Sequence, residues 1–336
     1  MESDSQTHYC KTTPTLSVVV PVFGCYSCLR HLHQRLTTSL EGLLISYEII
    51  FVDDRANDGS WGEIERLVAE DDSVRGVLLS RNFGQHAAIT AGLQHTRGDW
   101  AVVMDCDLQD PPEDVPRLYE KALEGHDIVF GRRRHKPTGA MRRLMGRLYF
   151  RGIRVLGGAR LDGQYGNFSI VSRKVIEAFL ALDDHDRHYV MILTWLGFDA
   201  TMVDYEPARR YSGRSSYSLP RLMKHAFDGV FFQTTVLLRW IVYAGFLMAA
   251  GGALLAAYLI GAKVAGEVYP GWTSIVVAVL LTGGFIIFST GITGLYIGKV
   301  FEQVRGRPVF VVDRIAERIE IDREAHERLT VLERRS

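Results

Sequence analysis

Three aspartates crowd the segment VVMDCDLQDPP, residues 102–112, directly after an apolar run. Carboxylates placed this close repel one another, and each raises its neighbours' pKa unless a cation lies among them. Asp105 and Asp107 are separated by one residue, so both can turn toward one ion in an extended loop. Hard oxygen ligands at this spacing favour Mg²⁺ or Mn²⁺, which commonly bind phosphate oxygens as well. The segment therefore predicts a divalent cation, although a D-x-D alone is frequent in solvated loops.

The elements that must position these acids alternate between strand and helix. Short β-branched runs predict strands at 16–22, 47–54, 76–80, 100–105 and 127–131. Helical spacing and helix-start signals predict helices at 25–44, from Ser60, at 83–96 and at 113–123. This alternation indicates an α/β fold with a doubly wound, mostly parallel sheet.

Ligands of such open sheets bind beyond the carboxyl ends of the strands. Those ends carry Asp53, Asp54, Asp105 and Asp107, so we expect the acids to face one crevice. No G-x-G-x-x-G follows the first strand and no G-x-x-x-x-G-K-[ST] occurs. A dinucleotide oxidoreductase and a P-loop enzyme thereby lose their main support.

Charge and cysteine content exclude further classes. Lys plus Arg equals Asp plus Glu at 39 each, so net charge gives no argument for nucleic acid, and we expect none as a partner. Four cysteines are too few for a disulfide scaffold, and no second pair or histidine cluster completes a zinc site around Cys25 and Cys28. A reducing compartment is the simpler interpretation.

Two stretches near the C-terminus are long enough to cross a membrane. They hold 23 residues without a charge between Arg239 and Lys263, and 31 between Glu267 and Lys299. About 20 apolar residues span a hydrocarbon layer ~30 Å thick, and buried helices of a soluble core seldom run this long without charge. Basic residues flank the pair on both outer sides, so the positive-inside rule places both flanks in the cytoplasm.

The predicted organisation has five parts. They are a polar N-terminal tail (1–15), a cytosolic α/β domain (16–217), an interfacial amphipathic helix (218–235), two transmembrane helices (236–298) and a cytosolic C-terminal tail (299–336). The N-terminal tail lacks the apolar core of a signal peptide. The helix at 218–235 fits the membrane interface and equally fits a helix packed on the α/β domain.

The motifs together resemble a known family. VVVPVF, FVDDRANDGS, LSRNFGQHAAITAGL, GDWAVVMDCDLQDPPEDVPRL and DIVFGRR are similar to the family 2 glycosyltransferases. More narrowly, they resemble the polyprenyl-phosphate branch, which includes dolichyl-phosphate mannose synthases and bacterial undecaprenyl-phosphate sugar transferases. YGNFSIVSRKVI, RRYSGRSSYSLPRL and the paired spans fit the bacterial membrane members, and the resemblance covers residues 16–312.

The resemblance implies a GT-A-like, nucleotide-sugar-binding sheet with a C-terminal transmembrane hairpin. It implies a UDP- or GDP-linked donor, Mg²⁺ or Mn²⁺ as cofactor, a polyprenyl (undecaprenyl) phosphate acceptor, and a homo-oligomer such as a tetramer. The enzyme would be a multi-pass protein of the bacterial inner (cytoplasmic) membrane, with its catalytic domain cytosolic. It would make a lipid-linked monosaccharide for modification of envelope glycans.

The resemblance also assigns roles by position. The expected nucleotide-sugar contacts are Pro21, Phe23, Asp53, Asp54, Asn82, Gly84, Gln85 and Asp105. The expected metal ligands are Asp105, Asp107 and Gln109. The expected catalytic residues are Asp107 and Asp162, and some relatives place the second acid where this chain has Gln164.

A lipid phosphate acceptor is already ionised at neutral pH, so it needs positioning and charge neutralisation more than a strong base. Guanidinium groups match phosphate oxygens. The expected acceptor or diphosphate contacts are Arg132, Arg133, Arg210 and Ser215, and Arg134 extends the run. The alternative is a basic face near anionic lipid.

Two positions depart from the family pattern. Ser216 stands where many relatives have lysine, and Arg55 adds a charge beside the proposed nucleotide pocket, where its role is open.

Three other classes remain as alternatives. A processive polysaccharide synthase would carry Q-x-x-R-W and more spans, whereas Gln233 and Arg239-Trp240 have the wrong spacing. A non-catalytic membrane scaffold or sugar-binding module would need no acidic cluster. A lipid-linked sugar flippase would need a polar pathway through many helices. The sugar and the nucleotide cannot be read from the sequence, because their selection rests on a few pocket contacts.

Overall fold

The computed structural model describes residues 14–133, 165–185, 187–208, 236–265 and 271–318. The chain divides into two compact units. The first contains residues 1–138, 162–214 and 308–336, and the second contains residues 139–161 and 215–307. The chain therefore passes from the first unit to the second and back again twice.

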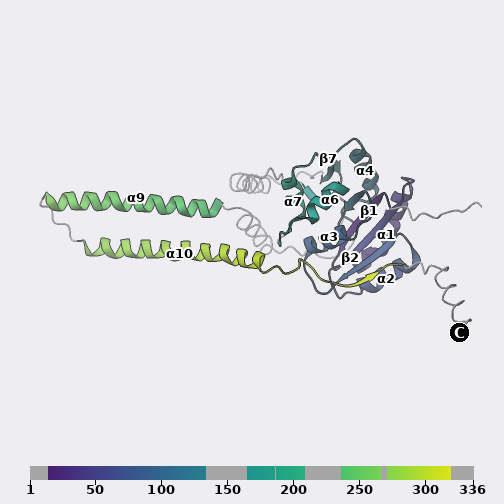
Figure 1. Ribbon diagram of the computed structural model, residues 1–336, viewed down its shortest axis with the longest axis horizontal. Helices are drawn as coiled ribbons and strands as arrows, with labels where there is room; N and C mark the ends of the chain where they lie inside the picture. Colours follow the sequence, from purple (N-terminus) through teal and green to yellow (C-terminus); the bar gives the residue numbers. More distant parts are fainter. Residues whose placement is uncertain (1–13, 134–164, 186, 209–235, 266–270, 319–336) are drawn as a thin grey trace, which may run out of the picture. The chain divides into compact units, whose positions relative to one another are not determined.

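An eight-stranded sheet forms the centre of the first unit (Figure 1). Its strands are β1 (Leu16–Val22), β2 (Tyr47–Asp53), β3 (Val74–Leu79), β4 (Trp100–Val103), β5 (Ile128–Arg133), β6 (Tyr165–Ser172), β7 (Ala200–Tyr205) and β8 (Val312–Ala316). Their order across the sheet is β7-β5-β6-β4-β1-β2-β3-β8. Only β6 and β8 run against the other six, so the predicted α/β, mostly parallel sheet is confirmed.

Strand direction decides which residues can meet. The carboxyl ends of β1, β2, β3, β4, β5 and β7 share one edge of the sheet. Because β6 is antiparallel to β4 and β5, its amino end lies at that same edge. Gly166 and Asn167 of β6 therefore join the strand ends that carry the acids.

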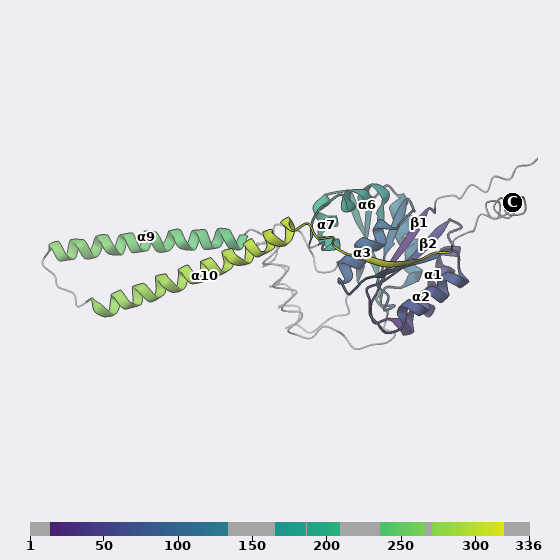
Figure 2. The ribbon, with the colours of Figure 1, turned by 60° about the horizontal axis from the view of Figure 1, so that its bottom comes forward.

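Helices cover both faces of the sheet (Figure 2). α1 (Tyr26–Glu41), α2 (Ser60–Glu70), the short 3₁₀ turn η1 (Pro112–Asp114) and α4 (Val115–Leu123) pack together on one face. α3 (Gln85–Gln94), α6 (Arg173–Leu180) and α7 (Tyr189–Leu196) pack together on the other. α1 buries Leu29, Leu32, Leu36 and Leu40, which are the spaced leucines of the sequence pattern. Burial of each of these leucine side chains stabilises the folded chain by about 1.5–3 kcal/mol relative to leaving the side chain exposed to water.

Helix α3 lies unusually close to the sheet. A Cβ added at Gly92 would lie 2.2 Å from Cγ1 of Val19, so only glycine fits there. Alanines 87, 88 and 91 of the same helix are buried as well. This close packing fixes the height of α3 above β1 and thereby places its first residue, Gln85, at the edge that carries the acids.

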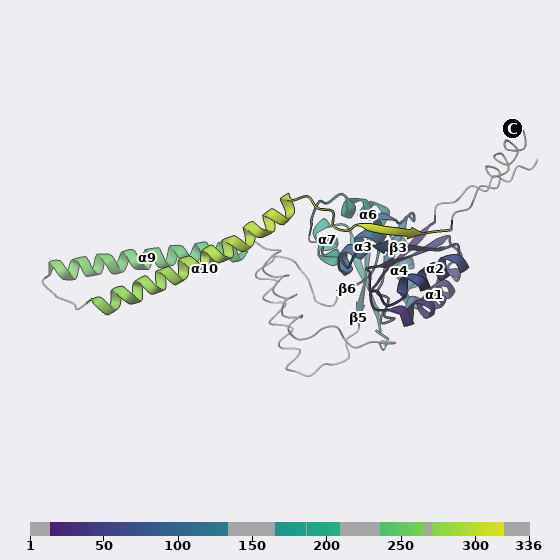
Figure 3. The same cartoon turned by 90° about the horizontal axis from the view of Figure 1, so that it is seen from below.

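Strand β8 closes the β3 side of the sheet, where it appears as the yellow strand in Figure 3. Arg75 of β3 donates to Glu48 of β2 (3.1 Å) and to Glu317, just past β8 (3.1 Å). Glu48 is 5% exposed and also accepts from Oγ of Ser17 at 2.6 Å. The C-terminal strand β8 is thus joined to the sheet by backbone pairing and, just past its end, by the ion pair between Arg75 and the exposed Glu317.

The second unit contains α9 (Val236–Val264) and α10 (Trp272–Val304). Among the described residues, one helical segment, Leu281–Val304, is long and apolar enough to cross a membrane. The apolar part of α9, Trp240–Leu255, is shorter. One membrane-spanning candidate thus matches the sequence prediction, and the two-span hairpin stays a prediction.

Candidate functional site

The three aspartates lie in the loop that follows β4. Met104 continues the strand by donating its backbone N–H to the carbonyl of Val19 (3.1 Å). Leu108 has a φ of 61°, which turns the chain sharply, and the Asp107 carboxylate accepts from the backbone N–H of Gln109 at 3.1 Å. The loop therefore gathers its acids at the carboxyl edge of the sheet, as predicted.

Asp105 is held by two amide side chains. Its Oδ1 accepts from Nε2 of Gln85 at 2.6 Å, and the side chain of Asn167 also donates to it. Burial raises the pKa of Asp105 to about 7, and the carboxylates of Asp110 and Asp107 add to the shift. Ionisation of Asp105 is thus unfavourable in this loop, and a divalent cation would offset that cost.

The two predicted nucleotide-pocket aspartates are 2% exposed and bind backbone amides. Asp53 accepts from the N–H of Ala56 (3.2 Å), inside its own turn. Asp54 accepts from the N–H groups of Phe83 (2.7 Å) and Gly84 (2.9 Å), one on each oxygen. Burial raises the pKa of both aspartates, although these hydrogen bonds oppose the shift.

Asp54 therefore joins the end of β2 to the β3–α3 loop. Gly84 caps α3 with a φ of 97°, a conformation that favours glycine. The Asp54 carboxylate stabilises this turn by accepting from the N–H of Gly84. Gln85 follows at once and reaches Asp105. The structure thus connects Asp54, Gly84, Gln85 and Asp105 in one chain of contacts.

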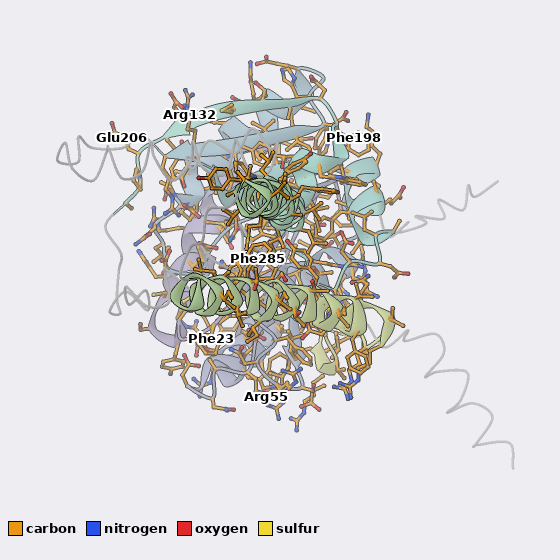
Figure 4. All side chains as sticks on the ribbon, turned by 90° about the vertical axis from the view of Figure 1, so that its left-hand side faces the viewer. Phe23, Arg55, Arg132, Phe198, Glu206 and Phe285 are labelled. Carbon is orange, nitrogen blue, oxygen red and sulfur yellow. A yellow bond between two sulfur atoms is a disulfide. The ribbon has the colours of Figure 1, made fainter. Side chains whose placement is uncertain are left out.

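The remaining predicted nucleotide contacts lie around the same edge. Pro21 lies within β1, opposite Val52, and is buried. Phe23 follows β1 and is 57% exposed, so its ring is available to a ligand (Figure 4). Asn82 is exposed in the β3–α3 loop.

Arg132 and Arg133 face opposite sides of the sheet, because neighbouring residues of a strand alternate. Arg132 pairs with Asp204 of β7, with an Nη2–Oδ2 distance of 3.0 Å. Arg133 instead donates to Oδ1 of Asp110 (2.9 Å) and to Oη of Tyr205 (2.8 Å). Of the four predicted phosphate contacts, Arg132 and Arg133 lie in the described part of the chain, and of these two only Arg133 bonds to the acidic loop.

Arg55 is tied to the C-terminal strand. It has a φ of 56°, and its Nη1 lies 2.5 Å from Oδ2 of Asp313 in β8. Figure 4 shows Arg55 and Arg132 far apart, in keeping with the positions of β8 and β5 toward opposite ends of the strand order. The sequence left the role of Arg55 open, and the structure pairs it with Asp313, so Arg55 links the β2–α2 loop to β8.

One disulfide crosses the site. It joins Cys25, just after β1, to Cys106, which lies between Asp105 and Asp107. The cysteine count did not predict this pairing, and the reducing compartment stays a prediction. Sequence spacing drew attention to Cys28, whereas the partner of Cys25 is 81 residues away and comes close only because β1 and β4 are neighbours.

Several predicted residues fall outside the described part of the chain, namely Arg134, Asp162, Gln164, Arg210, Ser215 and Ser216. Conversely, three residues at the site were not assigned a role from the sequence. Asp110 belongs to the quoted acidic motif and Asn167 to YGNF, so both carried a signal. Tyr205 carried none, because only the pairing of β7 with β5 brings it opposite Arg133.

Comparison with known proteins places the chain in a family. Residues 17–180 match the model of glycosyl transferase family 2. An uncharacterized glycosyltransferase of Synechocystis is 31% identical over 89% of this chain and 95% of its own. The undecaprenyl-phosphate 4-deoxy-4-formamido-L-arabinose transferase of Pseudomonas fluorescens is 35% identical over 89% of each chain.

A solved structure with a similar fold is glucosyl-3-phosphoglycerate synthase from Mycobacterium tuberculosis. It is 21% identical, with a TM-score of 0.45 over 66% of this chain and 78% of that one. The two relatives match this chain along most of their length. The family model matches the strands that carry the acids. The chain belongs to glycosyltransferase family 2.

Proposed function

We propose that this glycosyltransferase moves one sugar from a nucleotide-sugar donor to a polyprenyl phosphate, such as undecaprenyl phosphate. The observation that carries the proposal is the placing of the acidic loop beside Arg133 at one sheet edge. Acids suit a cation that binds the donor diphosphate, and a guanidinium suits a phosphate. The acceptor class is supported by the relative named as an undecaprenyl-phosphate transferase, 35% identical along most of both chains.

A divalent cation fits the loop. Among the described residues, no three acidic, histidine or cysteine side chains form a ready metal cage. Mg²⁺ and Mn²⁺ need no such cage, since one or two carboxylates and substrate phosphates suffice. In this proposal Asp105, Asp107 and Gln109 would hold the ion, which would supply Lewis-acid stabilisation of the leaving diphosphate.

The protein groups account for the other requirements. The exposed ring of Phe23 would stack on the base, beside Pro21, and Asp53 would lie under the ribose. Asp54 would keep Asn82, Gly84 and Gln85 in place by holding their loop.

The reaction requires one bond to form and one to break. An oxygen of the acceptor phosphate attacks the anomeric carbon, and the bond from that carbon to the donor diphosphate breaks with its electron pair. No proton must be removed from the nucleophile, so an acid such as Asp162 would orient groups more than accept a proton. Arg133, with Arg210 and Ser215 as further proposed contacts, would hold phosphate oxygens.

The membrane arrangement is part of the proposal. The apolar helix Leu281–Val304 would anchor the enzyme in the bacterial inner membrane, with the catalytic unit on the cytoplasmic side. The two-span arrangement, the interfacial helix at 218–235 and the homo-oligomer belong to the same proposal. An impermeant thiol reagent should label a cysteine placed at Glu267 in intact cells and spare one placed at Ser336.

The test of the function is direct. Membranes carrying the full chain are incubated with a panel of labelled UDP- and GDP-sugars and undecaprenyl phosphate, with Mg²⁺ or Mn²⁺. A lipid product with a single sugar is expected, and membranes carrying Asp107→Ala serve as the control. Products with many sugars would identify a processive synthase, and no transfer from any donor would refute the proposal.

A further inference from the structure

Arg133 is held by a closed ring of hydrogen bonds. Its Nη2 donates to Oδ1 of Asp110 (2.9 Å), and its Nε donates to Oη of Tyr205 (2.8 Å). Oη of Tyr205 in turn donates to the same Oδ1 of Asp110 (2.5 Å). Each of the three side chains therefore contacts the other two, and the guanidinium plane has one defined orientation.

The ring is built on the sheet itself. Arg133 and Tyr205 are register partners at the ends of β5 and β7. A Cβ added at Gly166 of β6 would lie 3.8 Å from Nε of Arg133, so the main chain of β6 lies alongside the guanidinium. Asp110 closes the ring from the acidic loop after β4. Three strand ends and that loop thus fix one cationic side chain.

Burial separates the roles of the three residues. Asp110 is 0% exposed and Tyr205 is 2% exposed, so no substrate can touch either of them. The Arg133 side chain is 28% exposed, so it reaches the surface of the site. An arginine has five N–H donors, and the ring uses two. The other three N–H groups have no hydrogen-bond acceptor among the described residues.

The ring is not the arrangement that stability alone favours. Oδ2 of Asp110 is buried and has no hydrogen-bond partner among the described residues. A buried charge pair that is incompletely satisfied is often less stable than apolar side chains of the same volume. Retaining it suggests a use for a rigid, charged guanidinium at this place.

We propose that Asp110 and Tyr205 are positioning residues that hold the Arg133 guanidinium ready for a phosphate oxyanion of a substrate. The inference deepens the proposed function and rests on it for the nature of the phosphate. A free arginine loses much rotamer freedom when it binds, and the ring removes that freedom before the ligand arrives. The oxyanion belongs to the donor diphosphate or to the acceptor, and the experiment separates the two.

The experiment measures binding, so it does not depend on turnover. The full chain in detergent is titrated with UDP and GDP, each with Mn²⁺, and with farnesyl phosphate as a soluble lipid phosphate. The variants are Tyr205→Phe, Arg133→Ala and the double variant. Tyr189→Phe is the matched control, since Tyr189 is 0% exposed and its hydroxyl bonds to Ser169 (2.9 Å), away from Arg133.

Tyr205→Phe is expected to weaken the binding of one phosphate ligand by about two- to tenfold, in line with the loss of one ordinary hydrogen bond that orders the guanidinium without touching the ligand. The same change in the Arg133→Ala background is expected to have no further effect on that ligand, because the two residues act as one unit. Tyr189→Phe should leave all three affinities near those of the wild type. Selective loss of nucleotide affinity identifies the donor diphosphate, and selective loss of farnesyl phosphate identifies the acceptor.

Three results would overturn the inference. Tyr205→Phe and wild type could bind every ligand equally, or Tyr205→Phe could weaken binding as strongly without Arg133 as with it. A wild-type protein that binds neither kind of ligand would overturn it too. Failure of the proposed function is a different result, in which the wild type binds the phosphates and transfers no sugar.

Discussion

Replacing Asp105 by asparagine should stabilise the cation-free enzyme at neutral pH. The pKa of this carboxyl is raised from 3.8 to about 7, first by burial and then by the charges of Asp110 and Asp107. One pKa unit corresponds to about 1.4 kcal/mol, so ionising Asp105 in the folded chain lowers the free energy of unfolding by at most about 4 kcal/mol.

The direction of the pH dependence follows from the raised value. Well below pH 4 the Asp105 carboxyl is protonated in both the folded and the unfolded chain, so it does not lower the free energy of unfolding. From about pH 4 to about pH 7 the unfolded chain loses this proton before the folded chain does, and the free energy of unfolding falls over that range. Above pH 7 Asp105 causes no further fall. Asparagine at this position cannot titrate, so the stability difference between variant and wild type should grow over that range.

The assay is urea unfolding of the detergent-solubilised full chain in EDTA, followed by circular dichroism between pH 4.5 and 8. Taking the difference between Asp105→Asn and wild type removes the contribution of other acids, including Asp53 and Asp54, whose pKa values are also raised. Saturating Mn²⁺ should stabilise wild type more than the variant, since the ion favours the ionised carboxylate. A difference that stays constant with pH, or a variant less stable than wild type at pH 8, would refute this account of the loop.

Three further outcomes follow from the site. Chelation by EDTA should abolish sugar transfer, and Asp107→Ala should reduce it by orders of magnitude; full activity of washed enzyme in EDTA would contradict the metal assignment. Oxidised protein should unfold at a higher urea concentration than Cys25→Ser. In the chain-entropy model, closing the loop of 81 residues between Cys25 and Cys106 adds roughly 4–5 kcal/mol to the free energy of unfolding. Equal urea midpoints would show that the bond does not form in solution. Arg133→Ala should raise the KM of a phosphate substrate about ten- to a hundredfold. Arg132→Ala should change that KM little, since Arg132 pairs with Asp204 on the other face of the sheet. Equal effects would refute the different roles given to the two arginines.

The parallel half of the sheet could be predicted because its signals are local. Each strand from β1 to β4 contains a short run of apolar residues, and α1 repeats its leucines at helical spacing. Ends of parallel strands meet at one edge by geometry, so the convergence of Asp54 with Asp105 followed from the order of elements alone.

The rest depends on pairings that no local pattern announces. β8 is a short strand that contains two charged residues, Asp313 and Arg314, and only its pairing with β3, far back in the sequence, makes it a strand. The ring around Arg133 has the same origin, since Tyr205 comes opposite Arg133 through the β5–β7 pairing. The different roles of Arg132 and Arg133 required knowledge of the strand register, which decides the face of each side chain.

The return of the chain to β3 has a consequence for how the protein is made. Roughly 230 residues separate the end of β3 from β8, so at 5–20 residues per second a ribosome needs about 10–50 seconds to reach the strand that covers β3. During that time the nascent sheet presents an open edge of unpaired backbone groups, to which another chain can add. The apolar helix of α10 is synthesised within the same interval. In the proposed membrane arrangement, α10 therefore enters the membrane while the catalytic sheet is still one strand short.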